Sequence, residues 1–338
     1  MAIVRNTKGE TVNDTVLELE NVSKRFGEFH AVREVSLAIP RGSIYGFLGP
    51  NGAGKTTTIR MIFDIIKPTS GRIAILGASS ALDVRSRIGY LPEEKGLYKA
   101  MTAAATVAYF ASLKGLSRKA ARQRARTLLE RYGLGEFADT RIQALSKGMG
   151  QKVQVLCAVA HEPEFVVLDE PFSGLDPVNQ QVLEKLIRDL SLLGSTVLFS
   201  THVMQHAERL CDRLLLIAKG RKIFDGTVAG AKGTIPRRVL ISTESSVEPL
   251  AALDAVAEIK PLGESATLAG TKDWEIRLRA QTGAQDSAQA ILESCFRSGI
   301  VLRRFDQSEP SLHDAFVALV GAGAHAGTQA GAQKGEAA

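Results

Sequence analysis

Two kinds of hydrophobic pattern alternate along residues 16–233. Early runs such as VLELENV and SLAIP switch between apolar and polar residues, a pattern typical of antiparallel strands with one solvated face. Later runs, SIYGFLG, FVVLDEP and STVLFSTH, are almost continuously apolar, as in strands that are buried on both faces. Because helical stretches separate these runs, the pattern predicts an α/β core with an antiparallel part.

Residues 79–141 carry a mostly helical pattern, which predicts a helical lobe inserted into this core. The lobe contains the most basic segment of the chain, SRKAARQRARTLLERYG at 117–133. Its basic residues recur at helical spacing, with Leu128 and Leu129 on the apolar side. Such a row is either a solvated helix face or a patch for acidic lipid or a protein partner, and charge alone does not decide between them.

Small and helix-breaking residues in AGAKGTIPRR, at 229–238, predict a domain boundary near residue 233. Beyond it RRVLISTES, DWEIRLRA and IVLRRFD predict strands, and AQDSAQAILESCFRSG and PSLHDAFVALVG predict helices. We therefore expect a small α+β domain over 234–320. Residues 1–15 are expected to form a flexible N-terminus, and the Ala/Gly-rich residues 321–338 a disordered tail.

Composition narrows the class of protein. The chain has 338 residues, of which 45% are hydrophobic and 23% charged, as in ordinary globular proteins. No run of about 18 apolar residues is present, so we expect no membrane span, and the first residues lack the apolar core of a signal peptide. The 3 cysteines have no CxxC spacing, which fits a reducing cytosol. The net charge of +6 admits an anionic partner, such as a nucleotide, a nucleic acid or a membrane surface.

The strongest chemical motif is GPNGAGKTT, at 49–57, which matches the pattern GxxxxGK[ST]. It follows the strand-like run SIYGFL and opens the helix-like run TTTIRMIF. Glycines let successive backbone N–H groups curl around a phosphate, and the helix N-terminus adds its dipole. Lys55 can reach the β- and γ-phosphates, and the Thr56 hydroxyl can ligate Mg²⁺. The motif predicts a nucleotide-phosphate site.

A second motif, FVVLDEP at 165–171, places two carboxylates at the end of a buried strand. Asp169 is positioned to hold the Mg²⁺ shell, and Glu170 is a candidate base for an attacking water. His202 ends another apolar strand, STVLFSTH, and is a candidate for the same site. A strand ending in Asp-Glu is a weak signal alone, but it becomes a strong one together with the glycine-rich loop.

With the string ALSKGMGQKVQ, at 144–154, these motifs together resemble the ATP-binding-cassette (ABC) ATPases. That family carries an LSGGQ-type signature, here LSKGMGQK, and a D-loop, here SGLD at 173–176. It also carries a switch histidine, here His202, and an aromatic residue that stacks on adenine, here Phe26. The resemblance covers about residues 16–230. It implies a P-loop NTPase fold, an ABC-type nucleotide-binding domain with an antiparallel subdomain and a helical lobe that includes the signature helix from residue 146.

The resemblance also implies how the site works. Two cassettes pair head to tail, so that Ser146 and Gly148 of one subunit complete the γ-phosphate shell of the other. The implied catalytic residues are Glu170, His202 and Lys55, and the implied metal ligands are Thr56, Asp169 and Glu93. The residues implied to contact ATP are Phe26, Gly49, Pro50, Asn51, Gly52, Ala53, Gly54, Lys55, Thr56, Thr57, Ser146, Gly148 and Asp176.

The chain departs from the family pattern at three positions. One of the two signature glycines is replaced by Lys147, and the signature glutamine is replaced by Met149. Lys147 either adds charge near phosphate or faces solvent, and we favour the second. In YLPEEKGLY, Glu93 takes the place of a glutamine. A carboxylate is compatible with Mg²⁺ but is repelled by the γ-phosphate, so we expect Glu93 on the metal side, and Glu94 toward a partner or solvent.

The string EPSLHDAFVALVG, at 309–321, points to one branch of the family. With YLPEEKGLY and LSKGMGQK it looks like the bacterial branch that includes sodium-extrusion and drug-efflux cassettes, which ends in a small domain. The resemblance implies an ATP-hydrolysing subunit of an exporter, with ATP and Mg²⁺ as cofactors. A membrane-spanning permease and a second cassette, identical or different, are the implied partners, on the cytoplasmic side of the inner membrane.

Two other classes share the phosphate motif. A cytosolic ABC-type ATPase that acts on DNA or the ribosome would carry a long coiled-coil insertion, zinc-binding cysteines or a second cassette, and the sequence has none of these. A nucleotide kinase or GTPase would have no use for the ABC signature, and the guanine-binding string NKxD is not present. We therefore favour the transporter subunit and expect no nucleic-acid partner.

Overall fold

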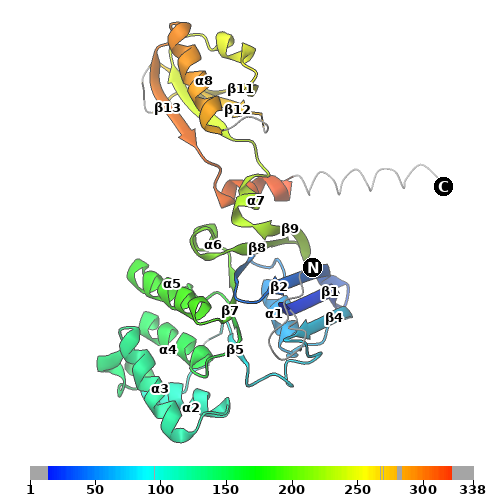
Figure 1. Cartoon of the computed structure of the whole chain (residues 1–338), viewed down its shortest axis with the longest axis vertical. Coiled ribbons are helices and arrows are strands. Elements are labelled where there is room, and N and C mark those ends of the chain that lie inside the picture. Colours follow the sequence, from blue (N-terminus) through cyan, green and yellow to red (C-terminus); the bar gives the residue numbers. More distant parts are fainter. Residues whose placement is uncertain (1–13, 95, 267, 269, 280–283, 322–338) are drawn as a thin grey trace, which may run out of the picture. The chain divides into compact units, whose positions relative to one another are not determined.

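The computed structural model describes residues 14–94, 96–266, 268, 270–279 and 284–321. The predicted flexible N-terminus, apart from Asp14 and Thr15, and the predicted disordered tail, apart from Gly321, lie outside the described residues. The chain divides into two compact units, Met1–Val228 and Ala229–Ala338. The division falls at the start of the stretch 229–238 from which a boundary near residue 233 is predicted. Figure 1 shows the elements of each unit.

A six-stranded sheet forms the centre of the first unit, in the order β5-β6-β7-β3-β8-β9. The strands are β3 (Ile44–Leu48), β5 (Ile88–Leu91), β6 (Phe165–Leu168), β7 (Thr196–Thr201), β8 (Arg213–Ala218) and β9 (Arg221–Thr227). All neighbouring pairs are parallel except β8 and β9. Every residue of β3, β6 and β7 is buried, which confirms the expectation drawn from their continuous apolar runs.

A three-stranded antiparallel sheet packs beside this centre, in the order β2-β1-β4. It comprises β1 (Thr15–Phe26), β2 (Phe29–Pro40) and β4 (Ser70–Ile75), and it confirms the antiparallel strands expected from the alternating runs. One hydrophobic core joins this sheet, helix α1 (Lys55–Ile62) and one face of the six-stranded sheet. Tyr45 and Phe47 of β3 face this core, whereas Ile44 faces the opposite one, as the two-residue period of a strand requires.

The opposite face of the six-stranded sheet shares a second core with a group of helices. These helices are α2 (Ala103–Leu113), α3 (Arg118–Arg131), α4 (Lys147–Val159), α5 (Pro177–Leu192) and α6 (Met204–Leu210), with short 3₁₀ turns at Gly135–Phe137 and Ile142–Ala144. Helices α4, α5 and α6 pack on this face of the sheet, and α2 and α3 pack on α4. The helical lobe expected over 79–141 includes β5, a strand of the central sheet. The first described helix of that range begins only at Ala103, so the expected lobe started too early.

The second unit contains an antiparallel sheet in the order β11-β12-β10-β13. Its elements are α7 (Val228–Lys232, which begins on the last residue of the first unit), β10 (Arg238–Thr243), a 3₁₀ turn (Glu248–Ala252), β11 (Val256–Glu264), β12 (Lys272–Leu278), α8 (Ala284–Arg297) and β13 (Leu302–Ser308), followed by a helix over 312–321. One sheet face and α8 share a core that includes Val239, Ile276, Ile291 and Cys295. The architecture is the small α+β fold that the sequence predicts.

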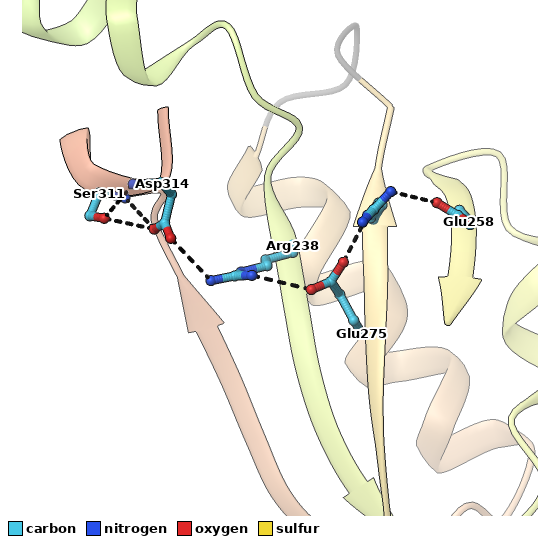
Figure 2. A network of polar contacts seen from close by, with 6 residues as sticks. Arg238, Glu258, Glu275, Ser311 and Asp314 are labelled. Atoms are coloured by element: carbon cyan, nitrogen blue, oxygen red, sulfur yellow. Dashed lines mark hydrogen bonds and ion pairs between the residues drawn. The ribbon is translucent and has the colours of Figure 1, made fainter. Parts of the chain in front are cut away.

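Charged side chains join the last helix to this sheet (Figure 2). Ser311 caps the helix, because its Oγ accepts a hydrogen bond from the Asp314 N–H at 3.1 Å, and the Asp314 carboxylate accepts from the Ser311 N–H in return. Arg238 of β10 lies 3.8 Å from Asp314 and donates to Glu275 of β12 at 3.2 Å. Arg277 then bridges Glu275 to β11. The conspicuous string PSLHDAF is therefore a helix cap with an anchor to the sheet.

Among the described residues, no helix is long and apolar enough to cross a membrane. The cysteines Cys157, Cys211 and Cys295 are all free thiols. Burial raises the pKa of each thiol. They therefore pack as small hydrophobic residues in the way expected from their spacing.

Candidate functional site

The glycine-rich loop, residues 49–54, joins β3 to α1 and has no room for larger side chains at its ends. A Cβ on Gly49 would lie 2.2 Å from the carbonyl oxygen of Ile217 in β8. Gly54 has φ +107°, and a Cβ there would lie 2.6 Å from the carbonyl oxygen of Ala31. Glycine is therefore required at both positions. No side chain caps the N-terminus of α1, so this helix end is open to an anion.

Lys55 is the first residue of α1, and its side chain folds back over this loop. The ammonium donates to the carbonyl oxygen of Gly49 at 2.7 Å and to that of Pro50 at 3.3 Å. It also lies 3.4 Å from Oε1 of Glu170, and only 6% of the Lys55 side chain is exposed. The structure thus brings the predicted lysine and the predicted base to the same point. A buried positive charge in a loop of this shape suits an oxyanion ligand.

Asp169 follows β6 and is almost completely buried. Its Oδ1 accepts a hydrogen bond from the Ser200 hydroxyl at 2.5 Å, while its Oδ2 is buried without a hydrogen-bond partner among the described residues. Burial raises the pKa of the Asp169 carboxyl, and the hydroxyls of Ser200 and Thr56 oppose that rise. Asp169 and Thr56 are therefore neighbours, as predicted. A buried, unpaired carboxylate oxygen beside a hydroxyl is the donor set that Mg²⁺ prefers, so these residues fit a metal ion.

The described residues contain no cluster of three or more His, Cys, Asp or Glu side chains that could hold a metal by themselves. This agrees with the chemistry of Mg²⁺ at nucleotide sites, where one or two carboxylates act together with phosphate oxygens and water. The protein itself therefore supplies only a few of the metal ligands at such a site.

Glu170 lies between the lysine and the histidine. Its Oε2 is 3.0 Å from Nδ1 of His202, and its Oε1 faces Lys55. The Glu170 side chain is 11% exposed, whereas that of His202 is 48% exposed. Glu170 has φ +48°, an uncommon conformation for a residue other than glycine. Its carboxylate is thus held close to the glycine-rich loop, with the imidazole on the more open side.

Ser200 holds both acidic residues in place, and it is not among the site residues predicted from the sequence. Its hydroxyl donates to Asp169 and accepts a hydrogen bond from the backbone N–H of Glu170 at 2.9 Å. Leu168 pairs with Phe199 in the parallel β6–β7 ladder, so the next residue of each strand also falls side by side. The signal available in the sequence was the small polar residue two positions before His202 in STH.

Replacing Ser200 by alanine should reduce the turnover of ATP more than its binding. The substitution removes one buried hydrogen bond to Asp169 and leaves the N–H of Glu170 without an acceptor, each worth about 1–3 kcal/mol. We expect kcat to fall by roughly tenfold or more, since 1.36 kcal/mol is a factor of ten in rate. The measurement is kcat for ATP hydrolysis alongside the Kd for ATP.

Ser195→Ala is the matched control for stability. Ser195 precedes the same strand, is also buried, and donates to the carbonyl oxygen of Pro163 at 2.7 Å. The Ser195→Ala variant should lower the melting temperature about as much as Ser200→Ala does, while its kcat stays near the wild-type value. Equal kcat for Ser200→Ala and Ser195→Ala would show that Ser200 does not position the acidic pair.

Glu93 follows β5 and lies close enough to Asp169 that its charge contributes to the raised pKa of that carboxyl. Glu94 points elsewhere, because its Oε1 lies 3.5 Å from the guanidinium of Arg60 and its side chain is 88% exposed. The carbonyl oxygen of Glu94 accepts a hydrogen bond from Gln154 of α4 at 3.1 Å. The two adjacent carboxylates therefore differ in their surroundings. Glu93 lies near Asp169, whereas Glu94 lies on the protein surface.

The signature segment begins α4 and contacts the loop at 173–176. Ser146 caps α4, accepting from the N–H of Met149 at 3.2 Å. A Cβ on Gly148 would lie 3.1 Å from the side-chain nitrogen of Asn179, and Asn179 in turn donates to Asp176, the cap of α5. That hydrogen bond lowers the pKa of Asp176, which stays anionic.

Lys147 lies against the same loop. Lys147 is exposed, in agreement with the favoured expectation, and its Nζ would be 2.6 Å from a Cβ on Gly174. Among the residues that the structure describes, no hydrogen bond or ion pair joins the signature segment or Asp176 to the glycine-rich loop. Phe26 ends β1 with half of its surface exposed, and the ammonium of Lys24 lies 5.0 Å from its ring centroid. Its ring is available for stacking.

Known proteins share this sequence and fold. A family model described as ABC transporter matches residues 32–173. An uncharacterized ABC transporter ATP-binding protein, YhaQ of Bacillus subtilis (strain 168), is 36% identical over 91% of this chain and 99% of its own length. The Nod factor export ATP-binding protein I of Sinorhizobium fredii (strain NBRC 101917 / NGR234) is 38% identical over 65% of each chain.

Solved structures with a similar fold belong to the same class of protein. A solved dimeric ATP-binding cassette in a post-hydrolysis state, bound to ADP and Pi, matches with a TM-score of 0.58 and 27% identity over 62% of this chain and 98% of that one. The glycine-rich loop with Lys55, the buried Asp169 and Glu170 lie within the residues that the family model matches. The chain therefore belongs to the family of ABC transporter ATP-binding proteins and is an ABC ATPase.

Proposed function

We propose that this chain is the ATP-hydrolysing subunit of an exporter and that it powers a separate membrane-spanning permease. The observation that carries the proposal is the convergence of Lys55, Asp169 and the pair Glu170–His202 on one glycine-rich loop. That set of groups suits phosphoryl transfer from ATP to water. Export is favoured because one similar protein is named for the export of Nod factor.

ATP would be held mainly by groups of the glycine-rich loop. Backbone N–H groups of residues 51–57 surround the phosphates, and the Lys55 ammonium leaves its carbonyl partners to contact them. The exposed ring of Phe26 stacks on adenine. Thr56, Asp169 and Glu93 would hold Mg²⁺, which when bound neutralises charge on the phosphate oxygens.

Hydrolysis would begin when Glu170 accepts a proton from water. The water oxygen attacks the γ-phosphorus, and the bond from that phosphorus to the β–γ bridging oxygen breaks, releasing ADP and phosphate. His202, held 3.0 Å from Oε2 of Glu170, orients the carboxylate and contacts the γ-phosphate from the open side. Ser200 keeps the backbone of Glu170 in its unusual conformation during this step.

A second subunit would complete the site. Ser146, Gly148 and Asp176 occupy exposed or half-buried positions in a surface formed by the ends of α4 and α5. Paired head to tail about a two-fold axis, this surface of one subunit would cover the phosphates bound by the other. The second subunit is either another copy of this chain or a related cassette. ATP then stabilises the dimer and hydrolysis releases it.

The signature helix α4 is connected to the acidic site at two points. Gln151 donates to the carbonyl oxygen of Pro171, next to Glu170, at 3.2 Å, and Gln154 donates to the loop that carries Glu93 and Glu94. A change at the γ-phosphate can therefore reach the surface around Glu94 through α4. We expect the permease to contact this surface, so that the subunit lies at the cytoplasmic side of the inner membrane.

A cross-linking experiment tests the permease partner. A cysteine at Glu94, whose side chain is 88% exposed, should form a cross-link to a membrane-spanning protein in cell membranes. Leu192→Cys at the end of α5, where Leu192 is 86% exposed, is the matched control and should form none. The native thiols at Cys157 and Cys295 are buried and should add little background. Products containing ribosomal protein or DNA, and no membrane protein, would favour the cytosolic ABC-type ATPase instead.

A further inference from the structure

Helix α3 carries basic side chains that the fold does not use. Among the residues that the structure describes, Arg124, Arg126 and Arg131 form ion pairs with Glu162, Asp139 and Asp189, respectively. Arg118, Lys119 and Arg122 form none. All three unpaired residues lie in the first half of the helix. The positive charge is therefore concentrated at one end of α3.

This end of the helix is an unfavourable place for cations. The first turn of α3 contains no acidic residue, and the aligned peptide dipoles already make a helix N-terminus positive. Arg118, Lys119 and Arg122 add to that potential. Helix stability does not account for their position, whereas binding of an anion would use both the side chains and the dipole.

Two of these side chains, Arg118 and Arg122, line a hollow between α2 and α3 with a volume of about 540 Å³. Arg126 and its partner Asp139 also line this hollow, so its unpaired positive charge comes from Arg118 and Arg122. Arg118, Arg122 and Arg126 follow one another at four-residue spacing, which places them on one face of the helix. Tyr109 and Leu113 of α2 line the same hollow and are 40% and 63% exposed. We call these five residues, with Ser112, the basic hollow.

We propose that the basic hollow binds the phosphate headgroups of anionic phospholipids. The forked guanidinium groups of Arg118 and Arg122 match phosphate oxygens, and arginine is the residue best suited to that contact. A free phosphate would use the arginines alone. The exposed Leu113 and Tyr109 beside them suit a ligand that is charged and apolar at once, which is the chemistry of a bilayer interface.

The inference rests on the proposed function, because a subunit bound to a permease lies at a membrane surface. The basic hollow would then add a direct contact between the cassette and the lipid. Each basic side chain near an anionic surface contributes roughly a fivefold factor in binding. Two unpaired arginines should thus change vesicle binding by roughly 25-fold.

The test uses the full chain without a permease, so that it does not depend on the exporter proposal. The chain should co-sediment with vesicles of phosphatidylglycerol and phosphatidylcholine, and it should not co-sediment with vesicles of phosphatidylcholine alone. The double variant Arg118→Ser/Arg122→Ser should bind the mixed vesicles roughly 25-fold more weakly, and binding should fall as salt screens the charges. ATP hydrolysis by this variant should equal that of the wild type.

Two controls test whether vesicle binding depends on the basic hollow itself. One excludes an effect of net charge, and the other excludes a site that binds phosphate alone. Arg303→Ser/Arg304→Ser removes the same charge from β13, where each arginine has a carboxylate partner, and should leave vesicle binding unchanged. Leu113→Ser should weaken vesicle binding if the ligand is a bilayer. Unchanged binding by Leu113→Ser, together with full competition by inorganic phosphate, would reduce the hollow to a phosphate site and overturn the proposal.

The proposal is also overturned if Arg118→Ser/Arg122→Ser binds mixed vesicles as the wild type does. If that variant loses its cross-link to a membrane protein while its vesicle binding is unchanged, the occupant of the basic hollow is an acidic protein segment. A failed cross-link from Glu94→Cys together with normal vesicle binding would count against the exporter proposal alone.

Discussion

Replacing Glu170 by glutamine is expected to lower kcat for ATP hydrolysis by about 10² to 10⁴-fold while ATP binding is retained, since general base catalysis is worth that factor. Glutamine has the same shape but accepts no proton from water at neutral pH. Its side chain can still approach His202, and the neighbouring Lys55 and Asp169 are unchanged. Measurements of single-turnover hydrolysis and of the Kd for ATP separate the two effects.

The same variant should trap the paired state. If ATP holds two subunits together and hydrolysis separates them, Glu170→Gln with ATP should form a dimer that persists during size-exclusion chromatography. The wild type should return to its starting state as ATP is consumed. A variant that keeps wild-type turnover would show that Glu170 is not the base.

Glu93→Gln is the matched control, because it makes the same chemical change on the same acidic group. An amide oxygen can still ligate Mg²⁺, so we expect this variant to remain active. Loss of hydrolysis in Glu93→Gln equal to that in Glu170→Gln would assign the Glu93 carboxylate a chemical role beyond metal binding. The comparison thus distinguishes the proton acceptor from its neighbour.

The glycine-rich loop could be predicted because its parts are contiguous in sequence. Strand, loop and helix follow one another without a break, so the roles of Gly49, Gly54 and Lys55 depend on local geometry alone. Asp169 and Glu170 could be placed for a related reason: a short, fully apolar strand ends at them, and residues at the ends of parallel strands meet at one edge of a sheet.

Ser200 could not be predicted in this way, since its role depends on the register between two strands. Only the pairing of Leu168 with Phe199 brings its hydroxyl to Asp169 and Glu170. The contact of Lys147 with Gly174 likewise joins segments that are far apart in the sequence. When the partner of a side chain lies in another element, the adjacent sequence gives little indication of the role of that side chain.

Secondary structure was missed where the hydrophobic pattern is short or weak. β5 has only 4 residues and lies within the range whose pattern predicts a helical lobe, yet its pairing with β6 makes it part of the central sheet. β11 is mostly exposed, so it lacks the apolar alternation by which strands are found. Both strands are specified by their neighbours more than by their own residues.

Removing the Lys55 side chain should abolish high-affinity ATP binding. Hydrogen bonds to charged groups contribute about 1.5–3 kcal/mol each, so Lys55→Ala should raise the Kd for ATP by roughly 10-fold to more than 10²-fold. The burial of this ammonium, at 6% exposure, favours the upper part of that range. Titration with a fluorescent ATP analogue measures the Kd, and the shift of melting temperature with ATP provides a second measurement.

Lys114→Ala separates this loss from a general loss of stability. Lys114 is also partly buried and also donates to two backbone carbonyl oxygens, those of Arg85 at 2.6 Å and Ile88 at 3.0 Å. Both variants therefore leave two carbonyl groups without their partner, and both should melt at lower temperature than the wild type. Only Lys55→Ala should also lose the stabilisation by ATP. A normal ATP affinity in Lys55→Ala would contradict the assignment of the glycine-rich loop as the phosphate site.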